Sequence, residues 1–366
     1  MGCFLRNSLN LASVHVLAWL LVAIGNLMVA QHARCADHRY RVRFFGPLEA
    51  NRSVRGDALW VTSINDRGEC VGWMGTQIGD TEEPTWAFRL QSPDILESYG
   101  RDLEADGRRM ASSINNDGAT VGYWQNDQRT SSKPFLWDKT GVKTLDTGTY
   151  GNGGASSINE RGVVAGALGR LPSDDHVAAI WRDGKPIVLG TLPGAKSSMA
   201  FSINDKDVVV GESDGLPFTW QDGTLAAWGE KDAFNAIRPL HINNDGDVVA
   251  YSTKGKGGFV WRNGTLAQLM NPLSTYSYVM PSHISDNGTI VGWAKGRSKY
   301  GNSACIWQRD GQGVDLNSLT QLTDDEHLLV ATARNRHGLI CGCGFQKGKP
   351  MGFILYPLTA GESDTE

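Results

Sequence analysis

The chain has 366 residues, of which 20% are charged and 40% are hydrophobic, and it carries 44 glycines and 12 tryptophans. Its formal net charge of −4 gives it no general attraction for nucleic acid phosphates or for anionic lipid surfaces, so we expect no nucleic-acid partner. The many turn-forming and large apolar residues argue against a disordered chain and predict a globular, sheet-rich body.

The first 36 residues differ from the rest of the chain. Arg6 precedes an apolar run over 16–24, which Gly25 and Asn26 end. Nine apolar residues suit the core of a signal peptide and are too few for a membrane-spanning helix, which needs about 20. We therefore predict that residues 1–36 are a signal peptide with an uncertain cleavage point. The protein is then secreted, extracellular or periplasmic, without a membrane span, and a retained N-terminal membrane anchor is the alternative.

A short phrase typified by Ser-Ile-Asn-x-x-Gly recurs seven times along the remaining chain. Its asparagine position recurs every 39 to 50 residues, at Asn65, Asn115, Asn159, Asn204, Asn243, Ser285 and Asn335. A period near 45 indicates repeated supersecondary units that bury their apolar faces against one another. Asparagine side chains stabilise the start of a tight turn, and glycine accepts the positive φ of a hairpin. We interpret the phrase as turn chemistry rather than as a catalytic or calcium motif.

Each repeat divides into four strands. In the third repeat, an aromatic strand at 133–137 returns through 142–145, and a glycine-rich connection leads to the Ser-Ile-Asn strand at 155–158. A tight turn then leads to a Val-Val-Gly type strand at 163–166. The aromatic strand recurs in every repeat, and its rings are expected to pack between neighbouring sheets.

Seven units of this kind predict an all-β fold, a seven-bladed β-propeller of four-stranded antiparallel blades, over residues 37–358. Residues 359–366 are expected to be a disordered tail. The strand at 40–45 can complete the last repeat, whose aromatic strand lies at 353–356, so the N- and C-terminal strands close the ring within one blade. Because this closure leaves no long free sheet edge, we expect a monomer.

Connection lengths predict the order of strands within a blade. The Ser-Ile-Asn strand is expected innermost, the Val-Val-Gly strand second, the aromatic strand third and the returning strand outermost. Both tight turns then lie on one face of the ring. The longer connections, at 74–84, 125–133, 229–239 and 271–281, lie on the opposite, long-loop face, where a rigid scaffold usually carries its binding loops.

Four cysteines lie outside the predicted signal peptide, namely Cys70, Cys305, Cys341 and Cys343. In an oxidising compartment they allow three disulfide pairings. Cys341 and Cys343 lie on one face of a strand, but no second pair of ligands accompanies them. Buried thiols or a structural bridge are therefore expected rather than a metal site.

Motifs for chemistry are missing from the sequence. There is no nucleophile elbow, zinc-protease helix or phosphate-binding loop. The segment 243–247 resembles part of a calcium loop but lacks the later bidentate acid. His241 and His283 occupy equivalent positions in successive repeats, and without a third ligand we expect them to form inter-blade hydrogen bonds. We predict no catalytic residue, no metal and no cofactor.

Aromatic residues follow the Val-Val-Gly strand in four of the seven repeats and approach the long-loop face. Exposed aromatic rings beside an arginine can bind a sugar, a peptide or an aromatic ligand by stacking and hydrogen bonding. Blade packing is the alternative use of the two tryptophans that follow this strand. The candidate ligand-binding residues are Trp73, Tyr123, Trp124, Arg238, Tyr276, Tyr278 and Trp293.

The paired phrases at 135–145 and 157–166 resemble those of the HAF-repeat group of extracellular repeat proteins, which occur mainly in bacteria. The resemblance extends over residues 40–357. This chain departs from the pattern at Asp207, Ser285 and Arg334, which replace glycine, asparagine and isoleucine. The resemblance implies an exported location and no established reaction.

We predict an exported, noncatalytic binding or interaction module whose variable loops bind a glycan or a protein. One alternative is a hydrolase or lyase acting on polysaccharide, with carboxylates such as Asp324, Asp325 or Glu326 converging at the axis. A structural component of the cell surface is the other.

Overall fold

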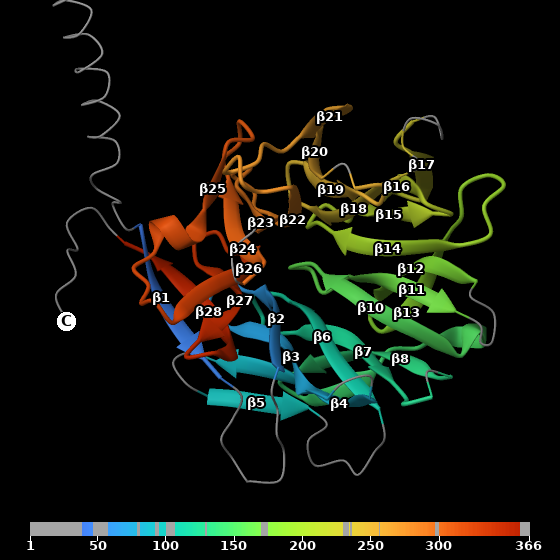
Figure 1. Ribbon diagram of the computed structural model, residues 1–366. Helices are drawn as coiled ribbons and strands as arrows, with labels where there is room; N and C mark the ends of the chain where they lie inside the picture. The colour runs from blue at the N-terminus through green and yellow to red at the C-terminus, as the bar shows by residue number, and fades with distance from the viewer. Residues whose placement is uncertain are drawn as a thin grey trace, which may run out of the picture.

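The computed structural model describes residues 39–46, 58–78, 81–91, 95–99, 107–128, 130–169, 175–229, 234, 236–255, 257–296 and 300–358. These residues form seven four-stranded antiparallel sheets arranged around a central axis, which confirms the predicted seven-bladed β-propeller (Figure 1). The predicted signal peptide and C-terminal tail lie outside the described residues. Within those ranges, no helix is long and apolar enough to cross a membrane.

The first four blades follow one another along the chain. Blade 1 contains β2 (Ala58–Ile64), β3 (Cys70–Ile78), β4 (Thr81–Gln91) and β5 (Ile95–Tyr99). Blade 2 contains β6 (Arg108–Ile114), β7 (Thr120–Gln125), β8 (Ser132–Asp138) and β9 (Gly141–Thr144). A 3-10 turn, η1 (Gly148–Tyr150), leads to blade 3, which contains β10 (Asn152–Ile158), β11 (Val164–Gly169), β12 (His176–Arg182) and β13 (Lys185–Gly190). Blade 4 contains β14 (Ser198–Ile203), β15 (Val209–Ser213), β16 (Leu216–Gln221) and β17 (Thr224–Ala227).

The last three blades complete the ring. Blade 5 contains β18 (Ile237–Ile242), β19 (Val248–Ser252), β20 (Gly258–Arg262) and β21 (Thr265–Gln268). Blade 6 contains β22 (Tyr278–Ile284), β23 (Ile290–Lys295), β24 (Asn302–Trp307) and β25 (Gly313–Asp315). A second 3-10 turn, η2 (Leu316–Leu319), leads to blade 7, which contains β26 (Glu326–Arg334), β27 (Ile340–Gln346), β28 (Lys349–Pro357) and the N-terminal β1 (Tyr40–Phe45).

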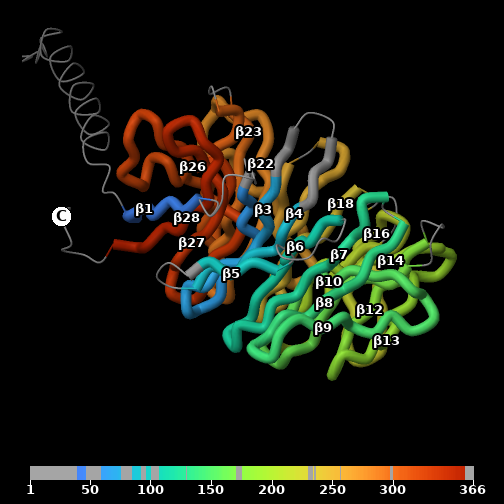
Figure 2. The backbone as a smooth tube through the Cα atoms, turned by 90° about the horizontal axis from the view of Figure 1, so that it is seen from below, coloured from blue at the N-terminus to red at the C-terminus, as the bar shows by residue number. Residues whose placement is uncertain are grey.

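Strands from both ends of the described chain close blade 7, as predicted. β1 pairs with β28 in antiparallel register, from Tyr40 opposite Pro357 to Phe45 opposite Gly352. In Figure 2 the blue β1 lies beside the red β28. This pairing satisfies the edge of β28 with a strand from the far end of the sequence, so the ring closes without a free edge at the junction.

The order of strands within a blade also agrees with the prediction. In blade 3 the order is β10, β11, β12, β13, and the other blades repeat it. The strands that carry the Ser-Ile-Asn phrase surround the axis in Figure 1, and residues from all seven copies line one central cavity. The phrase is therefore on the innermost strand.

The core lies between the faces of neighbouring blades. The aromatic strands supply its largest fully buried side chains, among them Phe88, Trp181, Phe218, Trp307 and Phe353. The neighbouring Val-Val-Gly strand carries glycine where it lies against the innermost and aromatic strands of its own blade. A Cβ on Gly211 would lie 2.0 Å from the Met199 carbonyl oxygen and 2.6 Å from Phe218 Cζ. The repeated aromatic and glycine residues thus fit one another, as the sequence indicated.

Two local features were open or wrongly predicted from the sequence, namely the connection at 74–84 and the state of the cysteines. The expected long connection at 74–84 is wrong, because β3 continues to Ile78 and pairs with β4 from Thr81. Thr76, Ile78 and Thr81 favour extended backbone and lengthen this hairpin. The four cysteines outside the leader are free, buried thiols, which is one of the two expected states.

Candidate functional site

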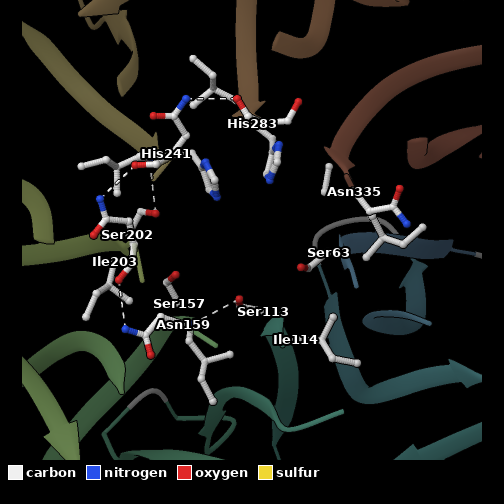
Figure 3. A pocket seen from close by; sticks show the side chains of 18 of the residues that line it. Ser63, Ser113, Ile114, Ser157, Asn159, Ser202, Ile203, His241, His283 and Asn335 are labelled. Atoms are coloured by element: carbon white, nitrogen blue, oxygen red, sulfur yellow. Dashed lines mark hydrogen bonds between the residues drawn. The ribbon is translucent and has the colours of Figure 1, made fainter. Parts of the chain in front are cut away.

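An axial channel of about 550 Å³ runs between the seven innermost strands. In Figure 3 the labelled serines and histidines of blades 1 to 6 surround the channel. Hydroxyl groups and two imidazoles dominate this level of the channel wall, which consists of Ser63, Ser113, Ser157, Ser202, His241, His283 and Ala333. The half of the channel nearer the tight turns is therefore polar.

The repeated asparagines join each blade to the next. Each Oδ1 accepts hydrogen bonds from two backbone N–H groups of its own turn, as Asn159 does from Arg161 at 3.1 Å and from Val163 at 2.9 Å. In six of the seven blades, Nδ2 donates to the backbone oxygen at the same position of the next blade, over 2.9 to 3.2 Å. This asparagine ring confirms the turn role and adds an inter-blade role that a single repeat could not reveal.

A second ring, the mouth ring, surrounds the channel opening on the tight-turn face. It is formed by the residue after each asparagine, whose backbone N–H donates to the side chain at the same position of the next blade over 2.7 to 3.0 Å. The accepting side chains are those of Asp66, Asn116, Glu160, Asp205, Asn244 and Asp286. These four carboxylates and two amides therefore help to hold the blades together.

Glu160 is the member of the mouth ring with a shifted pKa. Burial raises the pKa of its carboxyl, and the carboxylates of Asp205, Asp66 and Asp117 raise it further, against the hydrogen bond from the Asn116 N–H. Among the described residues, no group of three or more histidine, cysteine or acidic side chains could hold a metal ion.

Both rings are interrupted between blades 6 and 7. The asparagine ring lacks a donor here because Ser285 has no side-chain amide. The mouth ring lacks an acceptor here because the Arg336 side chain cannot accept a hydrogen bond. Arg334, which replaces the isoleucine of the other blades, extends Nη1 to Ser285 Oγ at 3.1 Å. Arg336 Nε lies 3.2 Å from Asp66 Oδ2. Two of the departures noted in the sequence therefore form one compensating contact across the same junction.

Asp207, the third departure, keeps the backbone conformation of the glycine that it replaces. Its φ is +59°, a value that aspartate adopts more readily than most residues. Its carboxylate accepts from Asn159 Nδ2 at 2.8 Å and pairs with Arg182 Nη2 at 2.7 Å and with Arg161. The substitution therefore adds polar contacts between blades 3 and 4.

His241 and His283 meet in the channel wall between blades 5 and 6. Their ring centroids are 3.9 Å apart, and within the described chain both Nδ1 atoms are buried without a hydrogen-bond partner. Burial lowers the pKa of His241 to about 4, against a smaller opposite effect of the Asp286 carboxylate. Burial, the neighbouring His241 and Arg334 lower the pKa of His283 well below its usual range. Both imidazoles are therefore neutral at pH 7, and they meet ring to ring.

The long-loop half of the inner strands carries larger side chains. Here the innermost strands present Trp60, Met110, Met199, Arg238 and Met280, each directly opposite a residue of the second strand. Those second-strand partners are Trp73, Tyr123, Glu212, Tyr251 and Trp293. The innermost strands thus carry small polar residues near the tight turns and mostly larger residues toward the long-loop face.

Four of the predicted ligand-binding residues pair with neighbours in this half. The Trp73 ring stacks on Trp60 with centroids 6.3 Å apart, and Trp293 contacts Tyr278 at 6.0 Å. Arg238 forms an ion pair with Glu212 at 2.9 Å and lies over the Phe201 ring. The contacts of Trp73, Tyr278, Arg238 and Trp293 leave all four only partly buried.

Tyr276 and Trp124 lie apart from these pairs. Tyr276 is buried in the core between blades 5 and 6, with its hydroxyl hydrogen-bonded to Asp315 Oδ2. Trp124 is half-buried and packs against Gly107, where a Cβ would lie 3.0 Å from the indole nitrogen. Neither side chain lines the axial channel or the cavity described next.

Tyr123 lines a second cavity of about 520 Å³, the side cavity, between blades 2, 3 and 4. Ser112 and Ser156 line both this cavity and the axial channel, so the two spaces are neighbours. Burial raises the pKa of the Tyr123 hydroxyl, which donates to Met110 Sδ at 3.0 Å. Of the seven candidate residues from the sequence, Tyr123 is the one that the structure places in a cavity wall.

Other residues of the side cavity escaped the sequence analysis. They include Gln125, Asn152, Gly154, His176 and Met199, which come from four strands of three repeats. The sequence does contain one indication of this cavity. The third repeat has Gly153 and Gly154 at positions where the other repeats carry larger residues. A comparison of aligned repeats at this position would have found it.

The comparisons with known proteins describe the fold. No protein family model and no curated protein matches the chain by sequence. The structure is similar to that of streptogramin B lyase, with a TM-score of 0.53 and 14% identity over 88% of this chain and 100% of the other. It is also similar to the β-propeller domain of the trilobed protease from Pyrococcus furiosus, with a TM-score of 0.56 and 12% identity over 84% and 97%. The likeness shows the propeller fold alone.

The carboxylates suggested for an axial enzyme site do not lie there. Asp324, Asp325 and Glu326 line neither the axial channel nor the side cavity. Glu326 accepts hydrogen bonds from the Thr323 N–H at 3.0 Å and from Gln346 Nε2 at 2.8 Å. Asp325 accepts from the Thr323 hydroxyl at 2.6 Å. Asp325 and Glu326 thus order the turn that precedes β26.

Proposed function

We propose that this protein is an exported, noncatalytic binding module that holds its ligand in the side cavity, on the long-loop half of the propeller. The observation that carries the proposal is the cavity itself, with Tyr123 and Met199 as walls and Gln125 and His176 as polar groups. Its volume of about 520 Å³ is in the range of known ligand sites. Such sites typically combine apolar walls with a few polar groups.

The scaffold around this cavity supports a binding role. The asparagine ring and the mouth ring join blades 2, 3 and 4 on the tight-turn face. The cavity lies at the other end of the same strands, beside connections that differ between repeats. Rigid elements that carry variable loops are a common basis for recognition. The resemblance to extracellular repeat proteins supports export, and a segment of a glycan or of a peptide is the ligand we infer.

Glycan and peptide arrays, probed with protein expressed from residue 37, test the proposal. A ligand found in this way should protect amide hydrogens of β7 and the start of β10 from exchange, and leave the tight turns at 65–68 and 159–162 unchanged. The Tyr123→Leu variant should weaken binding at least fivefold, because it removes the ring from the cavity wall. The matched Tyr356→Leu variant, in β28 of blade 7, should bind like the wild type.

Two results would contradict the proposal. If no ligand binds on the glycan array or on the peptide array, the proposed binding role is wrong. Protection confined to the tight-turn face, with Tyr123→Leu binding normally, would place the ligand elsewhere on the molecule.

A further inference from the structure

Blade 3 lacks the large side chains that other blades carry at one position of their two inner strands. Five blades carry bulky pairs across the two inner strands at this position, namely Trp60 with Trp73, Met110 with Tyr123, Met199 with Glu212, Arg238 with Tyr251, and Met280 with Trp293. Blade 3 has Gly154 opposite Ala167. The missing side-chain volume opens the side cavity at this blade.

One part of the side cavity, called the slot below, is lined by backbone and apolar side chains. Its floor is the extended backbone of Gly153, Gly154 and Ala155 in β10. The Tyr123 side chain from blade 2 lies on one side, with its Cβ 3.7 Å from the point where a Cβ on Gly154 would stand. The Met199 thioether from blade 4 faces the slot. Peptide planes, a tyrosine ring and a thioether are favourable surfaces for a planar aromatic group.

Polar groups stand at one end of this slot. Gln125 and His176 both line the cavity, and within the described residues no protein group forms a hydrogen bond with the side chain of either. The Asn152 amide oxygen already accepts from the Ser132 N–H at 2.8 Å. A buried or half-buried amide that has no partner favours a ligand that supplies one. The slot therefore suits a flat ring with a hydrogen-bonding group at its edge.

We propose that the side cavity is a recognition pocket for a planar aromatic ring that carries a hydrogen-bonding group, such as a phenol or an indole. The ring lies against the Gly153-Gly154 backbone and beside the Tyr123 and Met199 side chains, and its polar edge faces Gln125 and His176. The inference rests on the proposed function, because it names the chemistry of the ligand held at that site. The ring belongs either to a free small molecule or to a tyrosine or tryptophan side chain of a peptide.

Gly154→Met provides a sharp test because methionine occupies the same position in blades 2, 4 and 6. A Cβ at Gly154 meets only ordinary contacts at 3.7 Å or more, and its φ is outside the left-handed region. Gly153 cannot serve, since a Cβ there would lie 2.9 Å from the Ala167 carbonyl oxygen. The matched control is Val188→Met, in the outermost strand of the same blade, where the side chain is 44% exposed.

Ligand-observed NMR titration would measure binding of indole and 4-methylphenol, with cyclohexanol and glucose as nonplanar probes. The tripeptides Ala-Trp-Ala and Ala-Ser-Ala test whether the ring can come from a peptide. We expect wild type and Val188→Met to bind the aromatic probes and Gly154→Met to bind them at least tenfold more weakly. Cyclohexanol and glucose should bind at least tenfold more weakly than 4-methylphenol. If Gly154→Met does not fold, Gly154→Ala should give an intermediate loss of about threefold.

The possible outcomes separate the two proposals. Equal binding of indole and 4-methylphenol by wild type and Gly154→Met would overturn the aromatic pocket, as would a preference for glucose. If an array ligand still protects β7 and β10 in that case, the proposed binding role stands while the ligand chemistry is wrong. Binding of Ala-Trp-Ala together with free indole assigns the pocket to peptides, and binding of free indole alone assigns it to small molecules.

Discussion

Acidification should destabilise the propeller through the pair of imidazoles in the channel wall. The pKa of His241 is about 4 in the folded protein, and an unperturbed histidine has a pKa of about 6.5. Because the folded pKa lies below the unfolded one, the unfolded chain binds protons first as the pH falls. The stability that the neutral imidazole contributes is therefore complete above about pH 6.5 and is lost as the pH falls toward about 4.

The size of the effect follows from these values. A single group with pKa values of about 6.5 unfolded and 4 folded loses about 2 kcal/mol of folding free energy between pH 7 and pH 5. The pKa of His283 is also lowered, and a second proton would enter a ring whose centroid is 3.9 Å from the first. Both rings are partly exposed to the channel, where water screens charge. We therefore expect about 2 kcal/mol for the pair, the amount worked out for His241 alone.

Urea unfolding at pH 7 and pH 5 would measure this loss. The test variant is His241→Ser combined with His283→Ser, because serine occupies the same position in blades 1 to 4. The control is His337→Ser, which replaces an exposed histidine. On acidification, the free energy of unfolding of the wild type and of the control should fall by about 2 kcal/mol more than that of the double variant. The contributions of the carboxylates are common to all three proteins and cancel in this difference. An equal loss in the double variant would refute the reasoning.

Two further predictions concern the asparagine ring. Asn159→Ala should reduce the free energy of unfolding by about 3 kcal/mol in a urea titration, because it leaves several buried groups without partners. The control Asn271→Ala, at an exposed position, should change the free energy of unfolding by less than about 1 kcal/mol. Equal losses in the two variants would contradict an inter-blade role. Ser285→Asn and Arg334→Ile should each destabilise the protein, yet their combination should recover about 1 to 2 kcal/mol relative to the sum, since it restores the residues of the other blades. Strict additivity in this double-mutant cycle would show that the Arg334 to Ser285 contact carries no coupling.

Repetition made the architecture predictable. Each copy of the Ser-Ile-Asn phrase reports the same local hairpin, so seven copies establish seven blades even where single copies depart from the pattern at Asp207, Ser285 or Arg334. The closing strand was predictable as well, because 40–45 and 353–356 supply complementary parts of one unit. The error at 74–84 arose where strand length depends on pairing across a hairpin, and one strand read alone cannot show that pairing.

The candidate site was much less accessible to sequence reasoning. The aromatic residues near the long-loop face were visible, but their contacts were not: Trp73 stacks on Trp60 and Tyr276 lies in the core, whereas Tyr123 lines a cavity. Burial of an aromatic ring depends on the neighbouring blade, and the neighbouring blade is about 45 residues away in the sequence. Single-repeat patterns therefore named residues of the right type and could not select among them.

The sequence by itself determined the number of blades, their strand order, the closure in blade 7 and the turn chemistry of the repeated phrase, because all of these follow from local periodicity and connection length. Only the tertiary structure decided that the asparagines join neighbouring blades, that His241 and His283 meet, and that small residues in blade 3 open a cavity beside Tyr123. These features arise from side chains of different repeats that meet across an interface. Their distances depend on how the blades pack, and no single repeat encodes that packing.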